Sequence, residues 1–325
     1  MEKVIQIFLW ICAMPLFYGY VMALLAPYHW FFDTHVNFTI QYALGGLLLG
    51  IVALLLQCPV LGVLLLLVGL LNTYTVYNSY SDPFVFSSPY QNETPNLTIV
   101  QYNKLFPNQS WDKIEHWVKE NHENIDIMVV QESGIHTLYK LKNLEKYFPY
   151  QFPENPKQRF NDVSILSHIP FKVEEIPSLN IDGHTPGMKV TYQRPDMPEP
   201  LHLYSIHAQS PASSNKHKER TEDLLIMKQA IMKDPHPYKL FVGDLNTTPY
   251  SRVFQDFLSD TEMTYNDFKW FPNTTWHSDL RFPFLMIPID HMFYSPEIHQ
   301  ISKDVGPTLG SDHHMLMGKF RIPQE

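Results

Sequence analysis

The stretch Lys239-Leu-Phe-Val-Gly-Asp-Leu-Asn-Thr-Thr-Pro-Tyr-Ser251 decides the fold. Its apolar residues 240–242 predict a short strand that ends at Gly243 and places Asp244 and Asn246 on the following loop. Such a pair suits phosphoryl chemistry, because the carboxylate can orient or deprotonate a water and the amide can donate to a phosphoryl oxygen. On this stretch alone, an Asx turn that only satisfies backbone amides explains the pattern equally well.

Long apolar stretches set the N-terminal part of the chain apart. Residues 4–26 and 34–81 contain no Asp, Glu, Lys or Arg, which is typical of bilayer spans. A straight helix over 34–81 would be about 70 Å long, against a hydrocarbon thickness of about 30 Å, so the chain must turn back, and Pro59 is the natural position. We therefore predict a transmembrane region over residues 1–78.

The predicted transmembrane helices are 4–26, 40–57 and 60–77, and a linker rich in Ser and Pro follows over residues 79–95. The competing interpretation of the first span as a cleaved signal peptide is weaker, because Lys3 is the only basic residue before it and further apolar spans follow. Both cysteines, Cys12 and Cys58, lie in or beside the spans, so the remainder has no disulfide framework and no thiolate metal site.

Few charges determine the orientation of this region. The positive-inside rule keeps Lys3 in the cytoplasm, and three crossings then place the chain after the spans outside the cytoplasm, whereas two crossings would reverse this. The chain after residue 89 has more acidic than basic side chains. A protein that neutralises many duplex phosphates is expected to be basic, so this composition argues against nonspecific binding of duplex DNA.

Beyond the linker, polar side chains recur where predicted strands end. The apolar runs and the side chains that follow them are 96–100 with Asn103, 125–130 with Glu132, and 201–206 with His207. Helical spacing over residues 111–123 and 213–233 separates these strands, as in a layered α/β domain. Glu132 at the end of a buried strand is a good ligand for Mg²⁺, although a carboxylate at this position can instead cap the following helix.

Six short blocks, in the same order, resemble those of the endonuclease/exonuclease/phosphatase superfamily. They are Gln-Tyr-Asn103, Val-Gln-Glu132, Ser-Ile-His207, Gly-Asp244-Leu-Asn246, Ile-Asp290-His and Ser-Asp312-His313. The resemblance covers residues 96–322 and implies an α/β fold for a domain over residues 96–325. The implied architecture is a four-layered sandwich of two packed mixed β-sheets flanked by helices. With apolar helices ahead of it, the chain looks like the bacterial membrane-anchored members, which implies a multi-pass protein of the bacterial inner membrane. Three crossings with Lys3 in the cytoplasm would place its catalytic domain on the periplasmic or extracytoplasmic side.

The resemblance also implies a metal site and a catalytic set. The residues implied to hold a divalent cation, Mg²⁺ or Mn²⁺, are Asn103, Glu132 and Asp312. The residues implied to act on the phosphate ester are Asp244, which would orient or deprotonate water, Asn246 and His207, which would hold phosphate oxygens, and His313 with Asp290, which would stabilise the transition state or transfer a proton.

Two positions depart from the family pattern. His314 follows the Ser-Asp-His block and His168 follows Ser167, where many relatives have Arg. Both exchange a permanent cation for a titratable one, so we expect the charge of the substrate site to differ from that of relatives. Because a single buried histidine is more often structural than catalytic, we favour a structural role for His291 and His314.

The expected function is that of a membrane-anchored, metal-dependent phosphodiesterase that uses an activated water. The predicted partners are the lipid bilayer and a phosphate-ester substrate, which the anchor and the acidic domain favour to be a lipid headgroup. A tethered nuclease acting on DNA or RNA and an enzyme for a small phosphate ester are alternatives, because one fold serves many substrates. A catalytically silent binding module is disfavoured, because such proteins usually lose a metal ligand or the water-orienting Asp. No protein partner is inferred.

Overall fold

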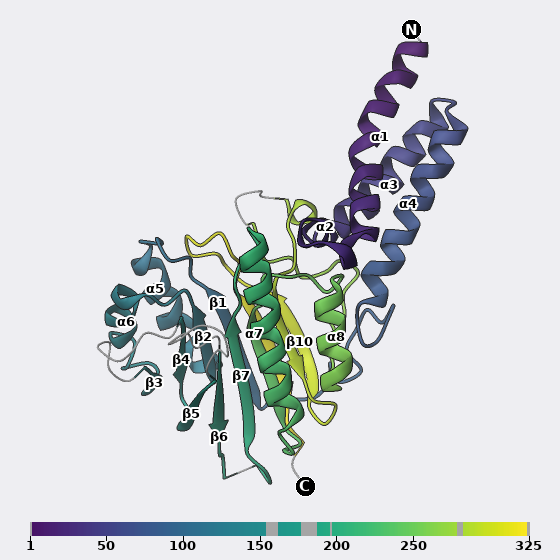
Figure 1. Cartoon of the computed structure of the whole chain (residues 1–325). Coiled ribbons are helices and arrows are strands. Elements are labelled where there is room, and N and C mark those ends of the chain that lie inside the picture. Colours follow the sequence, from purple (N-terminus) through teal and green to yellow (C-terminus); the bar gives the residue numbers. More distant parts are fainter. Residues whose placement is uncertain (1, 154–161, 177–186, 196, 278–281, 324–325) are drawn as a thin grey trace.

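The computed structural model describes residues 2–153, 162–176, 187–195, 197–277 and 282–323. Two mixed β-sheets pack against each other and helices cover their outer faces (Figure 1). The strand order is β10-β11-β1-β2-β4-β3 in the first sheet and β5-β6-β7-β8-β9 in the second. This is the predicted four-layered α/β sandwich.

The elements of the two halves are as follows. The first sheet consists of β1 (Leu97–Asn103), β2 (Ile127–Gln131), β3 (Tyr150–Phe152), β4 (Val163–Ser167), β10 (His299–Val305) and β11 (Leu316–Arg321), with helices α5 (Trp111–Asn121) and α6 (Ile135–Lys142). The second consists of β5 (Phe171–Ile176), β6 (Gly187–Tyr192), β7 (Leu201–His207), β8 (Lys239–Asp244) and β9 (Asp290–Tyr294), with helices α7 (Ser214–Met232) and α8 (Arg252–Thr261). Short 3-10 helices are η1 (Ala26–Tyr28), η2 (His122–Asn124) and η4 (Pro283–Leu285).

Alternation along the strands produces the layers. Successive side chains point to opposite faces of a sheet, so Leu240 and Val242 of β8 join the core between the two sheets, whereas Phe241 packs under α8 against Phe257. On β1, Ile99 faces the core between the sheets and Val100 faces the layer under α5. Because both faces of the central strands are buried, their sequences are continuous apolar runs.

Two parallel strand pairs fix where polar side chains meet. β1 runs parallel to β2 and places Asn103 opposite Gln131, and β7 runs parallel to β8 and places His207 opposite Asp244. β9 runs antiparallel to β8, so its first residue, Asp290, also lies opposite Asp244. All of these side chains therefore reach the same edge of the sandwich.

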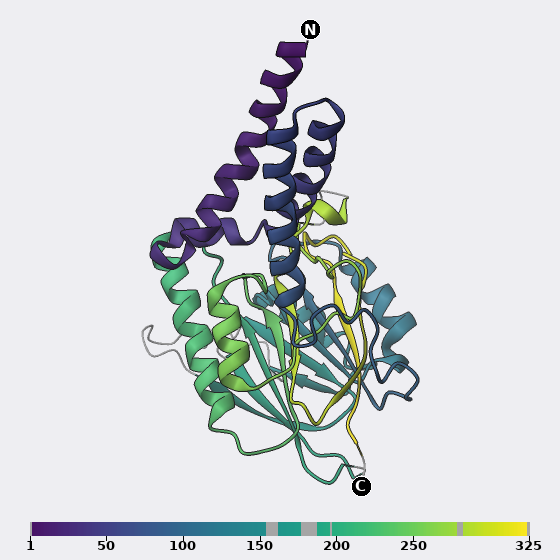
Figure 2. The same cartoon turned by 90° about the vertical axis from the view of Figure 1, so that its right-hand side faces the viewer.

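The N-terminal helices project from one end of the sandwich, opposite the C-terminus (Figures 1 and 2). They are α1 (Glu2–Leu24), α2 (Trp30–Val36), α3 (Thr39–Leu55) and α4 (Pro59–Asn78). Two of them, α1 and α4, are long and apolar enough to cross a membrane, and the pair α2 and α3, bent by 58°, would make a third span. The chain turns back at Pro59, where α4 begins, as predicted.

The packing of α3 on α4 is close. A Cβ added to Gly46 would lie 2.7 Å from the backbone nitrogen of Gly69, so only glycine fits there, as is common between membrane helices. The segment after α4 packs along the sandwich, because Ser81 exchanges hydrogen bonds with Tyr265 and Ser88 donates to the Gln300 carbonyl. The division of the chain into a membrane region, a linker and a catalytic domain stays a prediction.

Candidate active site

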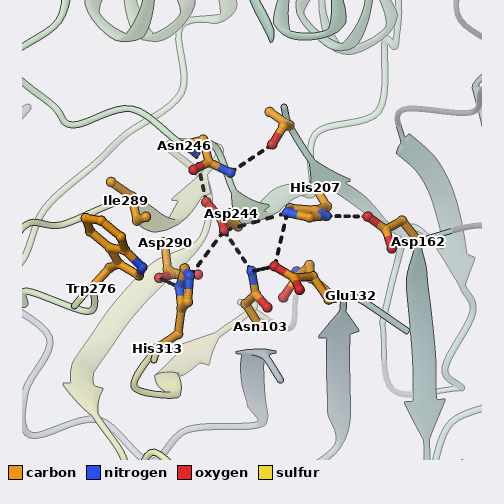
Figure 3. A network of polar contacts seen from close by, with 12 residues as sticks. Asn103, Glu132, Asp162, His207, Asp244, Asn246, Trp276, Ile289, Asp290 and His313 are labelled. Carbon is orange, nitrogen blue, oxygen red and sulfur yellow. Dashed lines mark hydrogen bonds and ion pairs between the residues drawn. The ribbon is translucent and has the colours of Figure 1, made fainter. Parts of the chain in front are cut away.

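Asp244 lies at the centre of a buried polar cluster at the edge where the strands converge (Figure 3). Its Oδ1 accepts a hydrogen bond of 2.8 Å from the Asn246 backbone N–H, and its Oδ2 accepts one of 2.9 Å from Asn103 Nδ2. The Nε2 atoms of His207 and His313 lie 3.9 and 3.8 Å from the same Oδ2. The carboxylate thus has an imidazole on either side.

Glu132 joins this cluster from the end of β2. Its Oε1 accepts a hydrogen bond of 3.0 Å from the same Asn103 Nδ2 and lies 3.9 Å from His207 Nε2. Its Oε2 accepts a hydrogen bond from the Phe106 N–H. Glu132 has φ 56°, a left-handed conformation that costs a residue with a Cβ about 1–2 kcal/mol. The N-cap of α6 is Gly134, and the Glu132 carboxylate accepts from Asn103 and Phe106, so Glu132 does not cap this helix.

His313 forms the first of two histidine–carboxylate pairs. Its Nδ1 donates to Asp290 Oδ2 at 2.8 Å. Burial lowers the pKa of His313, but the Asp290 charge and hydrogen bond, followed by the charges of Asp244 and Asp312, raise it to about 10. The imidazole is therefore protonated at neutral pH and can donate from Nε2 toward Asp244.

His207 forms the second pair, with Asp162, to which its Nδ1 donates. Burial lowers the pKa of His207, but the hydrogen bond and charge of Asp162, followed by the charges of Asp244 and Glu132, raise it to about 9. Both pairs thus present a cationic imidazole to Asp244. This arrangement can hold an anionic group such as a phosphate between the two rings.

The pKa values of Asp244 and Asp290 are shifted in opposite directions, although burial raises both. Burial and the neighbouring Asp290 raise the pKa of Asp244 to about 6, against the opposing effect of His313, His207 and Asn103. Burial also raises the pKa of Asp290, but His313 more than offsets this and the pKa lies below its ordinary value. Ligand atoms of Asp244, Asp290 and His313 lie within 4.8 Å of one another. The hydrogen bond between His313 and Asp290 leaves these two as an ion pair rather than as cation ligands.

Carboxylate oxygens for a hard cation are present on Glu132 and Asp312. Oδ2 of Asp312 accepts a hydrogen bond of 2.9 Å from Trp276 Nε1. Oδ1 of Asp312 is buried and has no hydrogen-bond partner among the described residues. A buried carboxylate oxygen is costly to leave uncompensated, and a cation or proton removes that cost. Oxygen donors of this type are those that Mg²⁺ and Mn²⁺ prefer, so the two residues fit such an ion.

Asn103 differs from the expected metal ligand. Its amide nitrogen faces Glu132 and Asp244, and its Oδ1 accepts from the Leu105 N–H at 3.0 Å. In this structure Asn103 therefore orients two carboxylates instead of offering an oxygen. Asn246 also has a local partner, because its Nδ2 donates to the Ala208 carbonyl at 2.9 Å.

The three other histidines considered in the sequence analysis, His168, His291 and His314, lie outside the cluster. His291 contacts the Tyr265 hydroxyl and the Thr247 carbonyl, and burial lowers its pKa to about 4. His314 Nδ1 bonds to the Gly306 carbonyl. The expectation that His168 adds charge to the substrate site is wrong, because His168 follows the far end of β4, whose last residue Ser167 pairs with the first residue of β2, Ile127.

Asp162 and Trp276 are two site residues that sequence reasoning missed. Asp162 directly precedes β4, which runs antiparallel to β2 and so begins at the edge where β2 ends. The sequence does show a carboxylate directly before a buried strand. Placing that carboxylate at the site requires the strand order, which the sequence does not show. Trp276 lies outside the named strands, in isolated β-bridges with Ile287 and His313, and its sequence carries no signal for its bond to Asp312.

Several solved structures are similar to this chain in fold. The beta toxin of Staphylococcus aureus, in a crystal structure with bound magnesium ions, superposes with a TM-score of 0.50 at 17% identity, covering 70% of this chain and 99% of that one. The mannosyl-6-phosphatase Bt3783 of Bacteroides thetaiotaomicron gives 0.53 at 17% identity, covering 69% and 99%. Sphingomyelinase C of Streptomyces griseocarneus gives 0.50 at 15% identity, covering 70% and 99%.

At these identities the similar structures support the fold alone, and no curated protein sequence matches the chain at a significant level. The family assignment comes from the sequence model of the Endonuclease/Exonuclease/phosphatase family, which matches residues 103–313. That match begins at Asn103 and ends at His313, and so spans the whole cluster around Asp244. The chain therefore belongs to the Endonuclease/Exonuclease/phosphatase family.

Proposed function

We propose that the protein is a membrane-associated, divalent-metal-dependent phosphodiesterase. The observation that carries this proposal is the convergence of two histidine–carboxylate pairs on one buried carboxylate, Asp244, beside the oxygens of Glu132. Cationic donors that flank a carboxylate base suit the attack of water on a phosphate ester, because the donors bind the anionic group while the base takes the proton.

In the proposed reaction, Asp244 orients a water and accepts its proton as the water oxygen bonds to phosphorus. His207 and His313 donate to phosphoryl oxygens, and His313 supplies a proton to the departing ester oxygen as the bond between phosphorus and that oxygen breaks. Glu132 and Asp312 would hold Mg²⁺ or Mn²⁺, and the bound cation would neutralise negative charge on the phosphate. Asp290 and Asp162 keep the two imidazoles oriented and protonated.

The fold alone does not select the substrate, since the similar structures include both a sphingomyelinase and a mannosyl-6-phosphatase. The apolar helices next to the sandwich favour a lipid headgroup over a soluble ester. The acidic composition disfavours duplex DNA as the substrate. We therefore expect the full-length protein, in lipid vesicles with Mg²⁺ or Mn²⁺, to hydrolyse sphingomyelin or another phospholipid faster than DNA or RNA. Faster hydrolysis of a nucleic acid would make the protein a tethered nuclease.

Glu132→Gln should raise the Mg²⁺ concentration needed for half-maximal activity about tenfold or more, because the oxygen that remains on the amide is neutral and a weaker ligand. Activity of the parent should disappear with a chelator and return with Mg²⁺. Glu145→Gln is the matched control, since Glu145 lies exposed beside Lys142 on the surface. An unchanged Mg²⁺ dependence in Glu132→Gln would contradict this assignment.

Asp162→Asn should lower kcat about tenfold at pH 8 and less at pH 6, because it removes the charge that keeps His207 protonated. The raised pKa means that the protonated imidazole is lost only as pH rises, so the variant should lose activity at a lower pH than the parent. The measurement is kcat from pH 5.5 to 9.5, with Asp304→Asn as control, since Asp304 is half-exposed and pairs with Lys269 away from the cluster. A uniform loss at every pH would indicate a purely structural role for Asp162.

We also propose three crossings, with the catalytic domain outside the cytoplasm. Lys3 is the only basic residue before the first span, and the positive-inside rule would keep it in the cytoplasm, which supports this orientation. In a bacterial host, alkaline phosphatase fused to the C-terminus should be active and a green fluorescent protein fused there should be dark. The opposite pattern would favour two crossings.

A further inference from the structure

The junction between α2 and α3 is fixed to the rim of the site by polar contacts. Asn37 Oδ1 accepts from the backbone N–H and the hydroxyl of Thr248, on the loop after Asp244. Asp33 pairs with Arg220 at 2.8 Å, and Arg220 in turn donates to the Asn246 carbonyl at 3.1 Å. The N-terminal segment therefore holds the loop that carries Asn246, and its position relative to the site is defined.

A cavity of about 190 Å³ lies between this junction and the site. On one side it is lined by Thr34, Asn37 and Phe38 of the N-terminal segment. On the opposite side it is lined by Asn246, Trp276 and Ile289.

The second wall of the cavity is continuous with the catalytic cluster, as Figure 3 shows. Asn246 donates to Asp244, Trp276 donates to Asp312, and Ile289 directly precedes Asp290. A group in the cavity would therefore sit next to the place where a phosphate is expected. The two walls together offer Phe38, Trp276 and Ile289 to that group, and no charged side chain lines the cavity among the described residues.

The cavity is at the end of the apolar helices. Gln41 of α3 donates to the carbonyls of Phe284 and Met286, which places the exposed, stacked rings of Phe282 and Phe284 beside α3. Figure 2 shows the yellow-green turn of η4 next to these helices, on the side of the sandwich from which they project. When α1 and α4 cross a bilayer, this side of the sandwich faces the membrane surface.

We propose that the cavity receives the first part of the hydrocarbon portion of a bilayer-resident phosphate diester, so that the N-terminal segment is part of the substrate site and not only an anchor. At about 190 Å³ the cavity is smaller than sites that enclose a whole drug-sized ligand, roughly 300–1,000 Å³, so the rest of the chain stays in the membrane. The inference rests on the proposed function, because it names the substrate of the same site.

The test compares each phospholipid, presented in vesicles to the full-length protein, with its deacylated glycerophosphodiester, which has the same headgroup and phosphate. The parent should prefer the lipid, and Ala212→Trp, which fills the cavity from an exposed loop position, should lower the lipid-to-deacylated ratio of kcat/KM about tenfold or more. Ser214→Trp, two residues further on and outside the cavity, is the matched control and should keep the ratio. Equal rates for lipid and deacylated ester, or an unchanged ratio in Ala212→Trp, would overturn the inference while leaving the proposed function standing.

Photocrosslinking provides a second measurement that does not depend on turnover. A phospholipid with a diazirine at the start of its acyl chain should label residues 34–38, and Ala212→Trp should remove this label while labelling of α4 persists. Persistence of the 34–38 label in Ala212→Trp would refute the cavity as its origin. Absence of metal-dependent hydrolysis of every ester would instead refute the proposed function, and the crosslinking result would then decide the cavity on its own.

Discussion

Asp244→Asn should lower kcat for phosphate ester hydrolysis about a thousandfold or more without unfolding the protein. A positioned general base contributes about 10²–10⁴-fold, and in the proposed reaction Asp244 would also orient the water between two imidazoles. Asn keeps the size of the side chain and can still accept from the Asn246 N–H, but it cannot take a proton. The measurement is single-turnover hydrolysis by the full-length protein at saturating Mg²⁺.

The stability of Asp244→Asn separates this loss from unfolding. The pKa of Asp244 is raised above its ordinary value of 3.8 to about 6, so ionisation of this group costs folding free energy as pH rises through that interval, and the cost is fully present at pH 8. Removing the charge should therefore leave Tm at pH 8 equal to or above that of the parent, after the Asn103 amide adjusts to its new neighbour. A large fall in Tm would contradict this account.

Asp267→Asn is a contrasting control for buried charge. Asp267 pairs with Lys303 at 2.6 Å, and both side chains are buried. Removing one partner of a buried pair typically costs about 3–5 kcal/mol, because the other charge is left uncompensated. Asp244→Asn should thus lower kcat and leave Tm unchanged or raised, whereas Asp267→Asn should lower Tm.

The site could be predicted where it follows strand ends. Asn103, Glu132, His207 and Asp244 each follow an apolar run, and parallel pairing brings such ends to one edge. Asp162 could not be found in this way, because it precedes a strand whose neighbour in the sheet is known only from the fold. His168 was misplaced for the same reason, since the direction of β4 decides which of its ends reaches the site.

Two strands that the sequence analysis does not predict, β5 and β10, carry little apolar signal. β5 is an edge strand of the sequence Phe-Lys-Val-Glu-Glu-Ile with several exposed side chains, so its pattern is that of a surface loop. β10 contains Lys303, which is buried in spite of its charge because Asp267 compensates it. Hydrophobic periodicity cannot predict such a buried ion pair, because its two members are 36 positions apart in the sequence and each alone resembles a surface residue.

His313 and Asp290 should act as one unit in catalysis. His313→Gln and Asp290→Asn should each lower kcat about a hundredfold or more, and the double variant should be little worse than His313→Gln, because Asp290 contributes only through the imidazole that it orients and charges. If the two residues acted independently, the losses of kcat in the single variants would multiply in the double variant, and this result would contradict the coupling.

The pH dependence distinguishes charge from geometry within this pair. Asp290 raises the pKa of His313, so the protonated imidazole, and the activity that needs it, is lost as pH rises through that pKa. In Asp290→Asn the alkaline limb of the kcat profile should move toward lower pH by about one unit or more, since an opposite charge at this distance shifts a pKa by about 1–3 units. A bound cation would lower the pKa of His313 in parent and variant alike, so the direction of the difference between them is unaffected. A profile of unchanged shape at reduced height would mean that Asp290 only positions the ring.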